Sequence, residues 1–166
     1  GDVVVVSGPG AMGLMSLQAF KSRGAFVILS GLASDTERLK LGKELGADVI
    51  VTSQEELREA VRTHRPGGAD ITCDAAGVIP SLNSCLDVIR PMGTHLQVAM
   101  YAGIKSFRMD ALFEKEVTYV PTNSTATSTW PLTLQLLEEG RLTMEPFVSK
   151  ILPISKWKEG FEAAEK

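Results

Sequence analysis

The stretch VVVVSGPGAMG, residues 3–13, decides the fold that we predict for this chain. Its first part, Val3–Val6, is apolar at every position, without the alternation of a strand that has one face in water. Such a strand suits a parallel sheet with helices on both faces. Its second part has the pattern G-x-G-x-x-G, and the sequence from Ala11 to Arg23 is compatible with a helix that stops at Gly24. The stretch therefore predicts a strand, a glycine-rich turn and a helix in succession.

Each glycine of this turn has a distinct use. Gly8 permits the tight turn, Gly10 has no Cβ to keep an anion away from the backbone, and Gly13 lets the helix pack closely on the strand. Free amides and the helix dipole then attract phosphate groups. The bare motif also occurs in turns that bind nothing. Directly after a strand, and at the head of an alternating pattern, it favours the pyrophosphate of a dinucleotide.

Strands and helices alternate through the rest of the chain. We expect further strands at residues 25–30, 48–51, 69–74, 94–100 and 117–120, an extended segment at 148–152, and a last helix that includes Trp157 and Phe161. Capping-box spacing at residues 34–37 and 53–56 marks two helix starts. The pattern predicts an α/β fold, a Rossmann-type doubly wound parallel sheet of about six strands with helices on both faces. Without a low-complexity linker, residues 1–166 form one domain.

Composition excludes several classes of function. The net charge of −3 and the pI near 5.4 give no basic surplus for nucleic acid. The longest apolar runs, such as Val3–Val6, are far shorter than the roughly 20 residues that span a bilayer, so we expect no membrane contact. Two cysteines cannot form a disulfide framework, and we expect a reducing cytoplasm.

The end of the second strand bears on the choice of cofactor. An acidic residue about 20 positions beyond the glycines usually binds the adenosine ribose hydroxyls, but Gly31 stands there and the first carboxylate is Asp35. Arg38 and Lys40 are the nearest cations that could approach a 2′-phosphate, with Ser30 as a further hydrogen-bonding group. Lys40 is more simply explained as part of a solvated helix face. NAD and NADP both remain possible, with a slight preference for NADP.

Four segments in order resemble a known family: VVVVSGPGAMGLM (3–15), ERLKLGKELGADVIV (37–51), ADITCDAAG (69–77) and LDVIRPMGTHLQVAM (86–100). They are similar to the cofactor-binding domain of the zinc-dependent medium-chain alcohol dehydrogenase/reductase superfamily, most of all its sorbitol and threonine dehydrogenase branch. The resemblance covers nearly the whole chain. It implies hydride transfer between NAD(P) and a small alcohol, polyol or ketone, at a zinc held by a separate GroES-like domain, in a homo-oligomer.

The resemblance also implies the residues that bind the cofactor. They are Gly8, Gly10, Ala11, Met12 and Gly13 at the pyrophosphate; Ser30, Gly31 and Arg38 at the adenosine ribose; Ala75, Ala76 and Gly77 beside the cofactor; Val98, Ala99 and Met100 at the nicotinamide carboxamide; and Asn123 and Ser124 near the same end. It implies no catalytic and no metal-binding residue here, because the zinc ligands belong to the GroES-like domain. We interpret the chain as a fragment of the enzyme that is inactive alone.

Other constellations in the sequence do not converge on a site. The candidate zinc ligands match no compact spacing; they are His64, Cys73, Cys85 and His95. We expect both cysteines to be buried structural residues. Asp70 and Asp74 are expected to lie on the same side of one strand, with roles in strand-end charge and loop capping.

Three alternative functions stay open. A zinc-independent reductase module and a non-catalytic dinucleotide sensor share this type of domain. An S-adenosylmethionine-dependent methyltransferase also has a glycine-rich first turn, but it usually carries an acid where Gly31 stands. The substrate is not encoded in these residues, because in the family its pocket comes largely from the other domain.

Overall fold

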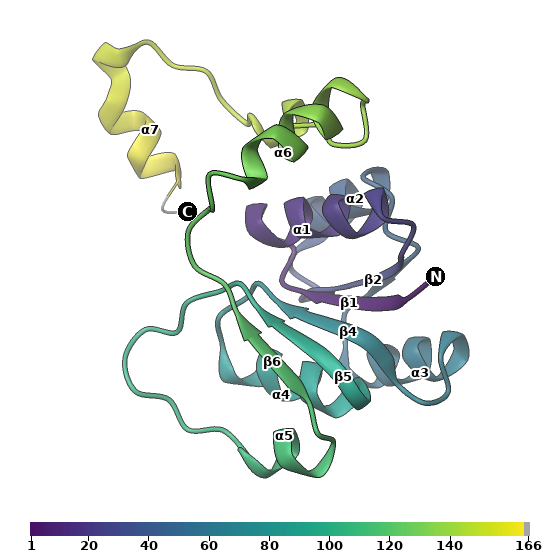
Figure 1. Ribbon diagram of the computed structural model, residues 1–166. Helices are drawn as coiled ribbons and strands as arrows, with labels where there is room; N and C mark the ends of the chain where they lie inside the picture. Colours follow the sequence, from purple (N-terminus) through teal and green to yellow (C-terminus); the bar gives the residue numbers. More distant parts are fainter. Residues whose placement is uncertain (165–166) are drawn as a thin grey trace.

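Six parallel strands form one sheet in the order β3-β2-β1-β4-β5-β6. The computed structural model describes residues 1–164 and shows helices on both faces of this sheet (Figure 1). The strands are β1 (Val3–Ser7), β2 (Phe26–Ser30), β3 (Val49–Val51), β4 (Ala69–Asp74), β5 (Ile89–Gln97) and β6 (Thr118–Pro121). The predicted doubly wound α/β fold is confirmed.

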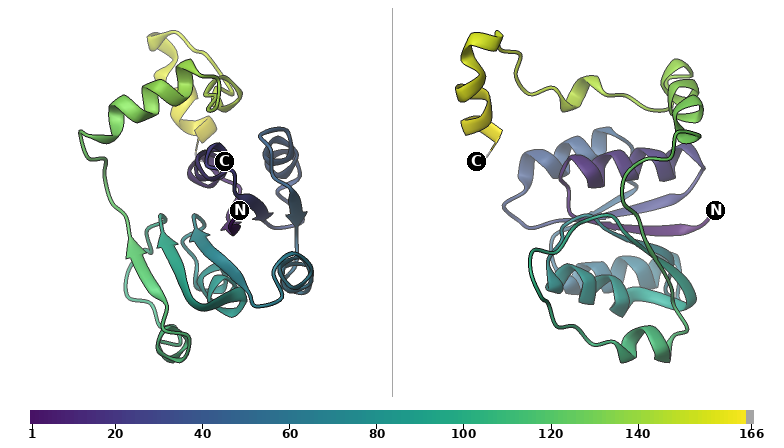
Figure 2. Two further views of the ribbon diagram at one scale, coloured as in Figure 1. Left: turned by 45° about the vertical axis from the view of Figure 1, so that its right-hand side comes forward. Right: turned by 60° about the vertical axis from the view of Figure 1, so that its left-hand side comes forward.

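The helices follow the strands in alternation. They are α1 (Ala11–Ser22), α2 (Thr36–Glu44), α3 (Gln54–His64), α4 (Ile79–Val88), α5 (Asp110–Glu114), α6 (Thr129–Glu138) and α7 (Trp157–Ala164), with 3-10 turns at Glu145–Phe147 and Ile154–Lys156. Helices α1 and α2 cover one face of the sheet, and α3 and α4 cover the other (Figures 1 and 2). Figure 2 shows α7 apart from the sheet, at the end of an arm. No helix within residues 1–164 has the length and apolar character to cross a membrane.

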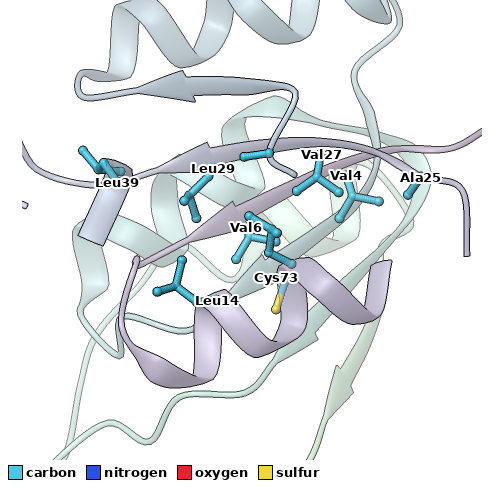
Figure 3. Packing of buried hydrophobic residues seen from close by; sticks show 10 residues of the cluster. Val4, Val6, Leu14, Ala25, Val27, Leu29, Leu39 and Cys73 are labelled. Atoms are coloured by element: carbon cyan, nitrogen blue, oxygen red, sulfur yellow. The ribbon is translucent and has the colours of Figure 1, made fainter. Parts of the chain in front are cut away.

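The valines of strand β1 contribute to hydrophobic clusters on both faces of the sheet. Val4 and Val6 pack in the cluster under α1, which also contains Leu14, Leu29 and Cys73 (Figure 3). Val3 and Val5 belong to the cluster on the opposite face. All four valines are buried, at 5% exposure or less. Because successive side chains of a strand point to opposite faces, only a strand apolar at every position can serve two cores.

One of the two predicted capping boxes is wrong. At the start of α2 no side chain caps the helix, and the Asp35 carboxylate instead accepts a hydrogen bond from the Leu32 amide at 2.8 Å. At the start of α3, Ser53 does accept from the Glu56 amide at 3.2 Å, as predicted. The Glu56 carboxylate accepts from the Thr52 amide, one residue before the expected Ser53. Loop geometry before each helix decides which amide is in reach.

The C-terminal part departs from the predicted pattern. Residues 148–152 pair with no strand of the sheet within the described chain. Strand β5 begins at Ile89 and ends at Gln97, whereas the sequence predicted a strand over residues 94–100. On α7, Trp157 and Phe161 contact each other edge to face at 6.2 Å yet remain 60% and 69% exposed. Helical spacing of apolar residues therefore did not mean burial here.

Candidate cofactor-binding site

A groove of about 470 Å³ lies at the carboxyl ends of β1, β2 and β4. The strand order reverses direction between β1 and β4, which is where ligands bind in open α/β sheets. The groove is lined by the glycine-rich turn, the end of β2, the loop before α3 and the start of α4; its residues are Ser7–Gly10, Ser30–Leu32, Asp35, Arg38, Thr52–Gln54, Ala75, Ala76, Val78, Pro80, Ser81 and Ser84.

The three glycines of the turn are required for three different reasons. Gly8 has a φ of +101°, and a Cβ there would lie 2.8 Å from the Ala76 nitrogen. A Cβ on Gly13 would lie 1.9 Å from the Gly8 carbonyl oxygen. A Cβ on Gly10, in contrast, would meet no atom of the described chain within 4 Å, so it would enter open space. Gly8 and Gly13 thus shape the turn, whereas Gly10 leaves the groove side of it empty.

The N-terminus of α1 opens at this empty space. Gly10 is the N-cap residue, and no side chain within residues 1–164 caps the helix there. Its carbonyl accepts the first helical bond, from the Leu14 amide at 2.9 Å. The amides of the first turn have no partners inside a helix and carry the positive end of its dipole. The predicted residues Ala11, Met12 and Gly13 therefore present their amides at the groove without lining its walls.

The end of β2 has less room than the sequence suggested. A Cβ on Gly31 would lie 2.8 Å from Cγ of Pro9 and 2.9 Å from a methyl carbon of Leu39. A side chain at this position would therefore have to displace the proline ring of the turn or the Leu39 side chain. Arg38 lines the groove with a 62% exposed side chain, 3.9 Å from the Asp35 carboxylate. Asp35 lies in the groove as well, which its sequence position did not indicate.

The predicted residues after β4 and β5 meet at the same edge. Ala75 and Ala76 line the groove. Gly77 has a φ of +70°, and a Cβ there would lie 2.7 Å from the Met100 carbonyl oxygen. The amides of Val98 and Ala99 both donate to the main-chain oxygen of Asp74 at 3.0 Å. Residues 98–100 therefore lie directly beside the turn at residues 75–77.

Not every predicted residue lines the groove. Those that do are Gly8, Gly10, Ser30, Gly31, Arg38, Ala75 and Ala76. Gly77 and residues 98–100 continue the same edge beyond it. Asn123 and Ser124 are exposed after β6, the next strand outward, and Ser124 has a φ of +64°. Seven of the sixteen predicted residues thus line the groove, three more begin α1 beside it, Gly77 and residues 98–100 continue its edge, and Asn123 and Ser124 lie after β6.

Sequence reasoning missed a buried polar cluster beneath the groove. The side chain of Asp74 is completely buried, and its Oδ1 accepts hydrogen bonds from the Ala76 amide at 3.0 Å and the Ser81 hydroxyl at 2.6 Å. The Ser7 hydroxyl lies 2.8 Å from that of Ser81. The expected loop-capping role of Asp74 is confirmed. The signal for the rest was an acidic residue between an apolar strand and Ala-Ala-Gly.

Asp70, at the other end of β4, does not act together with Asp74. Its carboxylate accepts from the Val3 amide at 2.9 Å and forms ion pairs with Arg65 at 2.6 Å and Arg90 at 2.9 Å. Burial by itself raises the pKa of Asp70, but these hydrogen bonds and the Arg65 charge outweigh it and hold that pKa below its usual value. Its role is structural.

The four candidate metal ligands lie on separate elements: His64 on α3, Cys73 on β4, Cys85 on α4 and His95 on β5. Both cysteines are free and buried, and burial raises the pKa of the Cys73 thiol to about 12. His95 is buried, with Nδ1 2.9 Å from the Thr72 hydroxyl. Within residues 1–164, no group of three or more histidine, cysteine or acidic side chains is arranged to hold a metal. The residues that the structure describes therefore do not fit a zinc ion.

Known proteins share both the sequence and the arrangement. The chain is 36% identical over 164 residues to a D-arabitol-phosphate dehydrogenase of Enterococcus avium, covering 97% of this chain and 47% of that protein. It is 34% identical over 166 residues to a sorbitol dehydrogenase of Halalkalibacterium halodurans, covering 98% of this chain and 48% of that protein. The chain thus spans about half the length of these curated relatives.

A solved structure and a family profile agree with these relatives. An alcohol dehydrogenase from Thermus sp. ATN1 superimposes with a TM-score of 0.86 and 28% identity, over 99% of this chain and 48% of that one. The family profile described as zinc-binding dehydrogenase matches residues 11–139. The match begins just after Gly10 and includes α1, the ends of β2, β4, β5 and β6, and the groove residues from Ser30 to Ser84. The chain therefore belongs to the zinc-binding dehydrogenase family.

Proposed function

We propose that this chain binds NAD(H) or NADP(H) as the cofactor domain of an alcohol or polyol dehydrogenase. The observation that carries the proposal is the open space at Gly10, between the uncapped N-terminus of α1 and the groove where the strand order reverses. A pyrophosphate placed there accepts hydrogen bonds from backbone amides and meets the positive end of the helix dipole.

The groove and the strand edge beside it offer binding groups to each part of a dinucleotide. The amides of residues 11–13 bind the pyrophosphate, and Ser30 and Arg38 line the groove on the side of the adenosine ribose. Beyond the groove, residues 98–100 offer backbone groups to the nicotinamide carboxamide, with Asn123 and Ser124 at the same end. The nicotinamide, when bound, supplies a hydride acceptor or donor. Small residues at 75–77 let it lie close to the sheet edge.

The choice of cofactor rests on the end of β2. We propose that NADP(H) binds at least as well as NAD(H), because no carboxylate stands at Gly31 and Arg38 is exposed at the groove. Asp35 lies 3.9 Å from Arg38 and reduces its pull on a 2′-phosphate. We therefore propose a modest preference.

The whole protein supplies the rest of the reaction. The relatives are named for a polyol and a polyol phosphate, which supports a polyhydroxy alcohol or its ketone as substrate. Because the described residues do not fit a zinc ion, we propose that the zinc and the substrate pocket belong to a GroES-like domain. From the resemblance to the family, we also propose that the whole protein forms a homo-oligomer and acts in the cytoplasm. This chain alone should show no turnover of polyols or secondary alcohols and no stoichiometric zinc after dialysis.

A ligand panel tests the proposal directly. We expect NADH or NADPH at about 100 times its Kd to stabilise the chain by about 2.7 kcal/mol, which is a rise in melting temperature of roughly 5 to 10 °C. S-adenosylmethionine at the same concentration should leave the melting temperature unchanged. A shift with S-adenosylmethionine and none with either dinucleotide would show a methyltransferase-like domain. A metal assay and an activity assay on the whole protein then distinguish a zinc enzyme from a zinc-free reductase or a sensor.

A further inference from the structure

Asp74 connects the two halves of the site described above. We propose that it is the positioning residue for the dinucleotide, holding the groove walls with one carboxylate oxygen and the nicotinamide end with the other. The proposal rests on the proposed function, because it concerns how the same site is held in shape.

The first oxygen fixes three separate elements around the groove. Oδ1 accepts from the Ala76 amide at 3.0 Å, in the turn after β4, and from the Ser81 hydroxyl at 2.6 Å, on α4. Ser81 in turn lies 2.8 Å from the hydroxyl of Ser7, at the end of β1. Ala76, Ser81 and Ser7 all line the groove. One buried oxygen therefore sets the relative positions of β1, β4 and α4 where the dinucleotide would lie.

The second oxygen and the main chain hold the opposite end. Oδ2 accepts a hydrogen bond from the Tyr101 hydroxyl. The main-chain oxygen of Asp74 accepts from the amides of Val98 and Ala99, both at 3.0 Å. Tyr101 directly follows Met100, so these three bonds enclose residues 98–100 from both sides. The backbone that would meet the nicotinamide thus depends on Asp74.

The chemical environment of Asp74 is unusual for a residue with only a structural role. Its side-chain partners are backbone amides and hydroxyls, and none of the ion pairs described for residues 1–164 includes it. Asp70, on the same strand, is paired with two arginines. Burying a carboxylate without a cation is costly, whereas a well-packed apolar group would stabilise at least as well. Its many directed hydrogen bonds are what an apolar side chain could not replace.

The test separates the two halves by using two ligands on the 166-residue chain. The affinity for NADH, measured by calorimetry, depends on both the groove and the nicotinamide end. The affinity for ADP-ribose, which lacks the nicotinamide, depends on the groove alone. Tyr101→Phe removes the hydroxyl that donates to Asp74 and lies 3.3 Å from Oε1 of Gln97, and it keeps the ring that packs near Leu82 and Leu86. We expect it to weaken NADH by about three- to tenfold and ADP-ribose by less than about twofold.

The other variants complete the pattern. Ser81→Ala should weaken NADH and ADP-ribose by the same factor, because it acts on the groove alone. Asp74→Asn retains the shape and one acceptor oxygen, and should weaken both ligands, NADH more than ADP-ribose. Asp70→Asn is the matched control on the same strand: its melting temperature should fall while the affinities for both ligands stay within about twofold.

The ratio of the NADH affinity to the ADP-ribose affinity decides the outcome. A residue with only a structural role would lower the stability of the chain and leave this ratio unchanged. If Tyr101→Phe and Asp74→Asn leave the NADH to ADP-ribose ratio at its wild-type value, the positioning role is wrong although the proposed function stands. If the wild-type chain binds neither ligand, the proposed function fails and this inference fails with it. Melting temperatures recorded for every variant confirm that each one is folded.

Discussion

At the start of β4, Asp70 accepts hydrogen bonds from the Val3 amide and from two arginines; at the end of the same strand, Asp74 is bonded only to amides and hydroxyls. The amino end of the sheet thus has its charges neutralised within the chain. The carboxyl end keeps an uncapped helix, an open groove and a buried carboxyl group that forms no ion pair among the described residues. The comparison teaches that the first end maintains the fold and the second is prepared for a ligand. Changes at the two ends should therefore separate stability from binding.

The largest effect is expected where the carboxyl end also supports the fold. A Cβ on Gly13 would lie 1.9 Å from the Gly8 carbonyl oxygen, so Gly13→Ala must displace α1 from β1. We expect a loss of more than about 3 kcal/mol in the free energy of unfolding, measured by urea denaturation. A variant with wild-type stability would show that the contact relaxes easily.

Gly10→Val should separate the two properties cleanly. Its side chain would enter open space, so the melting temperature without ligand should stay within about 3 °C of the wild-type value. The same side chain would occupy the space of the pyrophosphate, so the shift produced by NADH or NADPH should disappear. Gly10→Ala is the control, with a smaller obstruction and a partial shift. An unchanged shift in Gly10→Val would place the dinucleotide elsewhere.

The amino end should respond in the opposite way. Asp70→Asn removes the charge that pairs with Arg65 and Arg90, and we expect a loss of about 1 to 3 kcal/mol at pH 7. Because the pKa of Asp70 is lowered in the fold, its contribution is present above its ordinary pKa of 3.8 and is lost as the pH falls through the folded value. The stability difference between variant and wild type should accordingly shrink in acid. Equal losses at pH 3 and pH 7 would contradict this.

Between the two ends, His95 adds a pH response in a milder range. Burial lowers its pKa below the ordinary 6.5, so the folded state favours the neutral ring and the unfolded state takes up a proton more readily. The contribution of the neutral ring is complete above pH 6.5 and declines as the pH falls toward the folded value. Thermal melts between pH 5 and 8 should show a decline below about pH 6.5 that His95→Gln reduces. An identical decline in the variant would assign it to other groups.

The smallest effect concerns cofactor choice at the carboxyl end. Gly31→Asp places a negative charge beside a 2′-phosphate, so preference should move toward NAD(H), by a factor of about ten or less. Because the new Cβ would lie 2.8 Å from Pro9, the double variant with Pro9→Ala is needed to separate charge from strain. Both cofactors are titrated at one salt concentration. A wild-type chain that prefers NAD(H) tenfold or more would overturn the proposed preference for NADP(H).

Local sequence predicted the structure correctly where a single physical requirement fixes the residue type. The valine run predicted a strand between two cores, and Gly8 and Gly13 proved to be positions where a Cβ would strike the backbone. It failed where a pattern has several outcomes. The spacing at residues 34–37 fits a capping box, yet Asp35 binds the amide of Leu32 instead. For residues 148–152 the pattern predicted an extended segment but did not decide whether it would pair, and it joins no strand of the sheet within the described chain.

The candidate site divides in the same way. The glycine-rich turn was predicted from its place between a strand and a helix, and the residues at 75–77 and 98–100 from the resemblance to a known family. The contacts of Asp74 with Ser81 and Tyr101 were not, since those residues lie seven and 27 positions away along the chain. Nor was the approach of Pro9 to Gly31, which lie on different turns.

The sequence by itself determined the order of strands and helices along the chain, the lack of a basic surplus in the composition, and the glycine-rich turn. These follow from periodicity, charge and the conformational needs of single residues. Only the tertiary structure decided which side chains meet at the groove, that Asp70 and Asp74 serve opposite ends, and that Gly31 is crowded by Pro9. Such contacts join residues from separate elements, and they depend on packing distances that local sequence does not encode.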